Sequence, residues 1–199
     1  ITSNFAAGDS ALASNTTGTN NTASGRSALQ YNTTGDYNTA SGKNALQSNT
    51  TGHSNTASGV QALYHNTEGS GNTASGKSAL HSNTTGDYNT ASGVQALQNN
   101  TTGSSNTALG YNTGQGITTG SGNTILGANV TGLAAGLTNT IILADGTGAV
   151  RQTIDSSGNV GIGVNPSGYG AVGTATPIHL NFGNFYNGAD TCPYQGLGI

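Results

Sequence analysis

Seven carboxylates are the side chains of this 199-residue chain best suited to acid–base chemistry, and their spacing argues against a catalytic pair. Two carboxylates that cleave a glycosidic bond lie within roughly 5–10 Å of one another. Asp36 and Asp87 share one position of an internal 17-residue repeat but stand three repeats apart. If each repeat is one layer of a β-stack, about 14 Å separates them. We therefore predict a protein that is not an enzyme. The carboxylates are Asp9, Asp36, Glu68, Asp87, Asp145, Asp155 and Asp190.

The four histidines show none of the spacings of a metal site, and His65 and His81 fall at variable positions of the repeat, where solvated side chains are expected. The segment Asp145-Gly146-Thr147-Gly148 lacks the repeated acidic residues of a calcium loop and is interpreted as a turn. The sequence thus predicts no catalytic residue, no metal ligand and no cofactor. The histidines are His53, His65, His81 and His179.

Five tyrosines occupy variable positions of the repeat, which we expect to face outward. Exposed aromatic rings can stack on the faces of sugars, so these residues are candidate glycan or receptor contacts. The alternative is packing between neighbouring coils or chains. Tyr37 and Tyr88 follow Asp36 and Asp87 at one shared position and are the best candidates. The five are Tyr31, Tyr37, Tyr64, Tyr88 and Tyr111.

The composition is poor in charge: 6% of residues are charged, against about 25% in a typical domain. This predicts a surface of hydroxyls and amides. Four basic residues and a formal net charge of −3 give no case for a nucleic-acid partner. No apolar run approaches the roughly 18 residues of a membrane helix, so no membrane insertion is expected. The basic residues are Arg26, Lys43, Lys77 and Arg151.

Cys192 is the single cysteine, which excludes an intrachain disulfide and leaves a buried thiol, an interchain bridge or a free thiol open. No basic-then-apolar start typical of a signal peptide is present. The chain begins at Ile1 without an initiator methionine, so we expect a processed chain or a fragment of a longer one.

A repeat of 17 residues organises most of the chain. Asn-Thr-Ala-Ser-Gly recurs without insertion at Asn21, Asn38, Asn55, Asn72 and Asn89. Degenerate copies on the same grid begin at Asn4, Asn106 and Asn123. A fixed period is typical of repeat architectures, and this one is too short for helical pairs, which need about 33 residues or more. The glycines, and the Asn, Thr and Ser side chains that compete for the backbone, also disfavour helix.

We therefore predict an all-β fold in which each repeat is one coil of a parallel β-solenoid, or β-roll. Residues 22–24 form a short strand that stops at Gly25, and residues 28–31 form a second short segment. Residues 32–35 form a turn with Gly35 available for a positive φ angle. Coils stacked at the inter-strand spacing rise about 4.8 Å each.

The positions that do not vary between repeats are expected to build the stack. A leucine row forms the structural core, beside rows of alanine. Asparagines at two positions are expected to form amide ladders between coils. The two positions after each glycine and the two after each leucine vary freely, which predicts outward or loop locations. The leucines are Leu12, Leu29, Leu46, Leu63, Leu80 and Leu97.

One leucine and a few alanines per coil bury little apolar surface against the entropy of ordering 17 residues. A solitary rod therefore looks marginally stable, and lateral packing of several chains would bury a second face of each coil. We expect a parallel homo-oligomer, with a homotrimer as the commonest solution for fibres.

The phrase Asn-Thr-Ala-Ser-Gly-x-x-Ala-Leu resembles the repeat of the YadA-like head of trimeric autotransporter adhesins, over roughly Asn4 to Gly127. The resemblance implies a left-handed parallel β-roll that trimerises about its axis. The family places an aliphatic residue where this chain has Ser24 and its equivalents, and only Leu109 and Leu126 restore it. These two leucines suggest that this position points inward.

The sequence pattern changes over residues 139–164. Apolar runs separated by Asp-Gly and Ser-Gly turns predict a β-meander there. The stretch Ile-Asp-Ser-Ser-Gly-Asn-Val-Gly-Ile-Gly, from Ile154 to Gly163, resembles the shaft segments of bacteriophage tail fibres and tailspikes. We divide the chain into a solenoid at 1–138, a meander neck at 139–167 and a C-terminal β-segment or start of a tip at 168–199.

Together these observations predict a structural fibre of a phage tail that attaches to the host surface. Its expected location is the virion. Its expected partners are further copies of itself, other tail or baseplate proteins, and a host glycan or protein. The alternative is a bacterial surface adhesin head or extracellular filament subunit. A minor alternative is an ice-binding solenoid, since rows of Thr and Ser on a flat β-face can order water.

Overall fold

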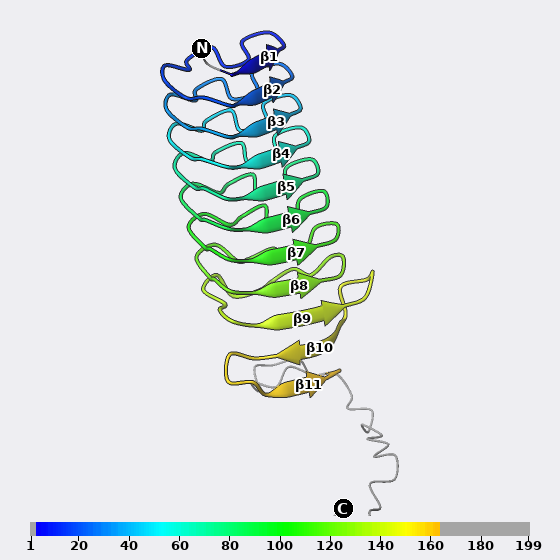
Figure 1. The fold of residues 1–199 in the computed structure, drawn as a ribbon. Coiled ribbons are helices and arrows are strands. Elements are labelled where there is room, and N and C mark those ends of the chain that lie inside the picture. The colour runs from blue at the N-terminus through cyan, green and yellow to red at the C-terminus, as the bar shows by residue number, and fades with distance from the viewer. Residues whose placement is uncertain (1–2, 164–199) are drawn as a thin grey trace, which may run out of the picture.

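The computed structural model describes residues 3–163 and shows eleven strands in one sheet, ordered as in the sequence (Figure 1). No helix occurs in these residues. The prediction of an all-β, parallel β-solenoid of 17-residue coils is confirmed, and the solenoid has about eight turns. Residues 164–199 lie outside the described part, which leaves out the end of the predicted neck and the whole predicted C-terminal segment with His179, Asp190 and Cys192. The strands are β1 (Phe5–Ala7), β2 (Thr22–Ser24), β3 (Thr39–Ser41), β4 (Thr56–Ser58), β5 (Thr73–Ser75), β6 (Thr90–Ser92), β7 (Thr107–Leu109), β8 (Thr124–Leu126), β9 (Ile141–Ala144), β10 (Val150–Ile154) and β11 (Val160–Ile162).

Each coil contributes a single three-residue strand, which pairs in parallel with the residues 17 positions away. In the β3–β4 pair, for example, Thr39 lies opposite Thr56, and Ser41 opposite Ser58. The remainder of the coil consists of turns, and these also bond to the next coil: the Leu29 N–H donates to the Ala45 carbonyl at 3.0 Å. The second short segment predicted at 28–31 is therefore a turn and not a strand. Its backbone groups are still satisfied between coils.

The leucine row lies inside the stack in an unusual backbone conformation. Leu29, Leu46, Leu63, Leu80 and Leu97 are fully buried and have φ angles between 48° and 51°. A left-handed conformation costs a non-glycine residue about 1–3 kcal/mol. Burying a leucine side chain returns about 1.5–3 kcal/mol, so packing can hold the turn in this shape. Leu12, in the first coil, is only partly buried against the same core.

The two glycines of each coil are required for different structural reasons. The prediction of a positive φ angle at Gly35 is wrong. The positive φ belongs to the first glycine, as at Gly25 with φ +137°. At Gly35 the constraint is close approach. A Cβ there would lie 2.3 Å from the Gly52 carbonyl oxygen and 2.6 Å from Asn32 Oδ1. Coils at inter-strand spacing leave no room for a side chain at this point.

Two rows of buried asparagine form the predicted amide ladders. In the first row, Asn55 Oδ1 accepts a hydrogen bond from the Asn72 backbone N–H at 3.0 Å, and Asn55 Nδ2 donates to the Gly69 carbonyl at 2.8 Å. In the second row, Asn66 Nδ2 donates to Asn49 Oδ1 and to the Gly69 carbonyl, both at 2.8 Å. The interior is thus part polar, and its amides are paired from coil to coil.

In the last coils apolar residues replace part of this interior, while the first asparagine row continues through Asn106 and Asn123. Ile117 occupies the position of the second asparagine row, so Asn100 Oδ1 is left buried without a partner. Gly114 stands where a leucine is expected, and Leu97 and Ile125 fill the space beside it. The core becomes more apolar as it approaches the neck.

The sheet continues across the predicted boundary at 138. Strand β9 pairs in parallel with β8 and antiparallel with β10, which pairs antiparallel with β11. In the turn between β9 and β10, Asp145 accepts hydrogen bonds from the Thr147 N–H at 2.9 Å and from the Ala149 N–H at 3.1 Å. Arg151 also pairs with Asp145. This carboxylate therefore organises a hairpin turn, in agreement with the turn predicted for residues 145–148.

We predict that Asn55→Ala lowers the free energy of unfolding by about 1–3 kcal/mol, the usual cost of an orphaned buried donor. The substitution leaves the Asn72 N–H without its acceptor. Urea unfolding followed by far-ultraviolet circular dichroism measures the change. Thr51→Ala, at an exposed position of the same coil, is the control and should cost less than about 0.5 kcal/mol. Equal losses in the two variants would contradict a structural role for the ladder.

Candidate binding surface

The outer face of the parallel sheet carries two columns of side chains. In β2 to β5 the threonine and the serine are exposed while the alanine between them is buried. The expectation that the Ser24 position points inward is therefore wrong. Leu109 and Leu126, which suggested it, are themselves 53% and 37% exposed. Alternation along the strand explains this, because the threonine and the serine share one face and the buried alanine takes the other.

The two columns change character along the rod. From β2 to β6 they consist of threonine and serine only. From β7 onward the serine column continues as Leu109, Leu126 and Leu143, and the threonine column reaches Ile141 in β9. The face thus has a hydroxyl part over five coils and an apolar part next to the neck.

The five candidate tyrosines occupy four different positions of the coil, so they do not form one site. Tyr31, Tyr37, Tyr88 and Tyr111 are exposed, and Tyr64 is half-buried. Only Tyr37 and Tyr88 share a position. They are the most exposed of the five, at 64% and 70%, and immediately precede Asn38 before β3 and Asn89 before β6. They form a sparse aromatic column along one edge of the sheet face, about 14 Å apart.

Tyr64 packs against the neighbouring coil, which is the alternative to a glycan contact. Its ring stacks on that of His81 in the next coil, with centroids 5.2 Å apart, and meets His65 edge-on at 4.5 Å. Partial burial, and then the proximity of His65, lowers the pKa of His81. Within residues 3–163, no group of three His, Cys, Asp or Glu side chains is arranged to hold a metal ion. This cluster reinforces the contact between two coils.

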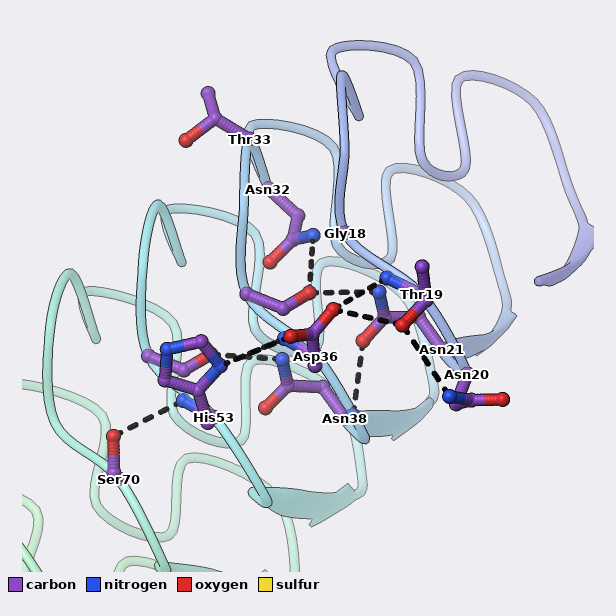
Figure 2. A network of polar contacts seen from close by, with 12 residues as sticks. Gly18, Thr19, Asn20, Asn21, Asn32, Thr33, Asp36, Asn38, His53 and Ser70 are labelled. Atoms are coloured by element: carbon purple, nitrogen blue, oxygen red, sulfur yellow. Dashed lines mark hydrogen bonds and ion pairs between the residues drawn. The ribbon is translucent and has the colours of Figure 1, made fainter. Parts of the chain in front are cut away.

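The sequence predicts that the position of Asp36 varies freely, but the structure constrains it. In six consecutive coils, from Asp36 to Ser121, the side chain at this position accepts a hydrogen bond from a backbone N–H of the coil before it. The Thr19 N–H donates to Asp36 Oδ1 at 2.6 Å, and the Asp36 N–H donates to His53 Nδ1 at 3.0 Å (Figure 2). The His53 N–H then donates to Ser70 Oγ at 3.0 Å. The ladder continues through Asp87, Ser104 and Ser121. Only residues with a short acceptor side chain occur here: Thr19, Asp36, His53, Ser70, Asp87, Ser104 and Ser121.

This acceptor ladder gives Asp36 and Asp87 a structural role. The Thr19 N–H, the Thr19 hydroxyl and the nearby His53 hold the pKa of Asp36 below its usual value. Asp87 accepts the Ser70 N–H at 2.7 Å in the same way. Both carboxylates cap backbone donors at the coil edge. The signal for this ladder in the sequence is the shared acceptor chemistry of the residues at one position of the 17-residue repeat.

Comparison of the chain with protein-family models, with curated proteins and with solved structures finds no match. None of the secondary structure in residues 3–163 is a helix long and apolar enough to cross a membrane.

We predict that stability falls below about pH 4, where an ordinary aspartate takes up its proton. The pKa values of Asp36, Asp145 and Asp155 are lowered by hydrogen bonds in the folded protein. Their contribution to stability is complete above the unfolded pKa and is lost as the pH falls through the folded pKa. Thermal unfolding midpoints between pH 7 and roughly pH 2 measure it.

The matched pair is Asp36→Asn and Glu68→Gln. The asparagine keeps an acceptor for Thr19 but cannot titrate, so its unfolding midpoint should depend less steeply on pH than that of the wild type. Glu68 is exposed and outside the acceptor ladder, and its variant should retain the wild-type slope. An unchanged slope in Asp36→Asn would refute the role given to this carboxylate.

Proposed function

We propose that the protein is a non-enzymatic structural fibre of a phage tail, which extends from the virion and attaches to a host-surface glycan or protein. The observation that supports this most is that different positions of the coil serve stacking and exposure to solvent. Invariant residues bond one coil to the next, and the exposed columns on the outside repeat at each coil. A stiff rod with repeated weak contacts gains avidity without a deep pocket.

The proposed contact with the receptor is the aromatic column of Tyr37 and Tyr88. Both rings stand beside hydroxyl-rich strands, and a tyrosine presents an apolar face together with a polar tip. Tyr88 also lies against Gly71 in the preceding coil, where a Cβ would come within 2.7 Å of its ring. The missing side chain at Gly71 keeps the ring seated on the coil.

Assembly as a parallel homotrimer belongs to the same proposal. The coil interior is narrow, filled by alanine, asparagine and one leucine. The apolar part of the sheet face, with Leu109, Leu126 and Ile141 exposed, offers each copy additional surface to bury. These side chains would hold copies together near the neck, next to the meander that resembles phage shafts.

A bacterial surface adhesin is the second candidate. The resemblance of the repeat to YadA-like heads favours it, and the same columns would serve as the adhesive surface. An electron micrograph of the native fibre distinguishes the two candidates by showing whether it is attached to a phage tail or to a bacterial cell.

We predict that the double variant Tyr37→Ala/Tyr88→Ala loses at least about tenfold in attachment, since each stacked ring contributes about 1 kcal/mol or more beyond its area. Fluorescently labelled protein is applied to a panel of bacterial cells and to an array of their purified surface polysaccharides. The unfolding midpoint should stay unchanged because both side chains are exposed. Tyr111→Ala, also exposed but at another position of the coil, is the control. Wild-type attachment by the double variant would refute the contact.

We predict that sedimentation equilibrium gives three times the chain mass for the wild type. Leu109→Ser/Leu126→Ser should shift the protein toward monomer, because it removes apolar surface that only another copy covers. Val60→Ser/Val94→Ser, which alters exposed valines outside the two sheet columns, is the control and should remain trimeric. A stable folded wild-type monomer would contradict the proposal of a trimer.

A further inference from the structure

The hydroxyl part of the sheet face, over β2–β6, is a regular two-dimensional array. Its two columns are in strict register, with threonine opposite threonine and serine opposite serine in every pair and no bulge. Along the rod the hydroxyls repeat at the strand spacing of about 4.8 Å, and across it at two residues, about 6.6 Å. Figure 1 shows these strands stacked in one column and pointing the same way.

The hydroxyls of this array are not used by the fold. No side-chain hydrogen bond involves them within residues 3–163, although the threonines at another position do bond between coils. Thr50 Oγ1, for example, donates to the Thr67 carbonyl at 2.9 Å, and Thr33 Oγ1 to the Thr50 carbonyl at 2.9 Å. The row that contains Thr33 and Thr50 is therefore committed to stacking. The sheet-face row is presented to the solvent, as is the row of Thr51 and Thr85 off the sheet face.

The array is also rigid and uncharged. Each of its strands is hydrogen-bonded on both edges, and neither column contains an ionisable side chain over β2–β6. The threonine methyl groups add apolar contact between the hydroxyls. Water molecules that bind to the two columns would therefore meet hydroxyl groups at the spacing of the strands.

We infer that the Thr/Ser face of β2–β6 binds ice. Its two repeat distances are close to spacings between oxygen atoms on ice surfaces, so hydroxyls and their bound waters can continue the lattice. The side-chain positions are fixed by the stack, and little conformational entropy is lost on adsorption. The serine column is essential to the inference, because its outward direction turns a single threonine row into a two-column array.

This activity is independent of the attachment proposed above, and it requires the β2–β6 face to stay uncovered in the assembled protein. Contacts between copies through Leu109 and Leu126 involve the neighbouring apolar part of the face. A close-packed assembly that also covered β2–β6 would abolish ice binding.

The experiment uses the whole chain, labelled with a fluorophore, and a single ice crystal grown slowly in its solution. Adsorption to the crystal and thermal hysteresis are measured together. The face variant is Thr56→Lys/Thr90→Lys, which places two long charged side chains within the array. Its matched control is Thr51→Lys/Thr85→Lys, which changes exposed threonines five residues earlier in the same two coils but off the sheet face. Circular dichroism establishes that both variants fold.

We expect the wild type and the control to adsorb to specific planes of the crystal and to produce hysteresis, and the face variant to lose both. Absence of adsorption by the wild type overturns the inference and leaves the attachment proposal untouched. Equal adsorption by the control and the face variant also overturns it, because binding would then not use this array.

Discussion

Each coil lies in register with the coil 17 residues away and is hydrogen-bonded to it at the strand and at the turns, and this register is the constraint on which the structure depends. The strand residues, the leucine turn, both asparagine rows and the Asp36 position all make such contacts. Within residues 3–163 each coil is hydrogen-bonded to the coils before and after it, so an insertion in one coil would break all these ladders together. The absence of insertions follows directly. The close approach at Gly35 has the same origin, because coils at strand spacing touch backbone to backbone.

The interior shows how a chain of low hydrophobicity can fold. A narrow coil cannot be filled by large side chains, and buried polar groups are costly unless they are bonded. The asparagine amides resolve this because each one bonds both to its neighbour in the row and to a carbonyl of its own stack. The exception at Asn100 Oδ1 marks the point where Ile117 ends one row and an apolar core begins. This change in the interior comes just before the antiparallel neck, where coils no longer repeat.

Function must then lie in what the register leaves exposed. The tyrosine column, the hydroxyl array and the apolar end of the sheet face are distinct surfaces on one rod, and each is repeated or continued by the stacking itself. A surface built this way gains strength by repetition, since many weak contacts act together when they are held at fixed spacing. Repeated contacts of this kind suit the attachment of a fibre to a cell surface, and they equally suit binding to an ordered solid such as ice.

The sequence by itself determined the period, the strand at 22–24, the amide ladders and the all-β solenoid, because a strict repeat forces equivalent residues into equivalent places. It did not determine which way the Ser24 position faces. That depends on which of three strand residues the narrow interior admits, and only the folded coil shows that alanine is the one. The left-handed leucine turn and the acceptor role of Asp36 were likewise decided by tertiary structure. In both cases the local preference of the residue is overridden by contacts with a coil 17 residues away, and no local pattern encodes such contacts.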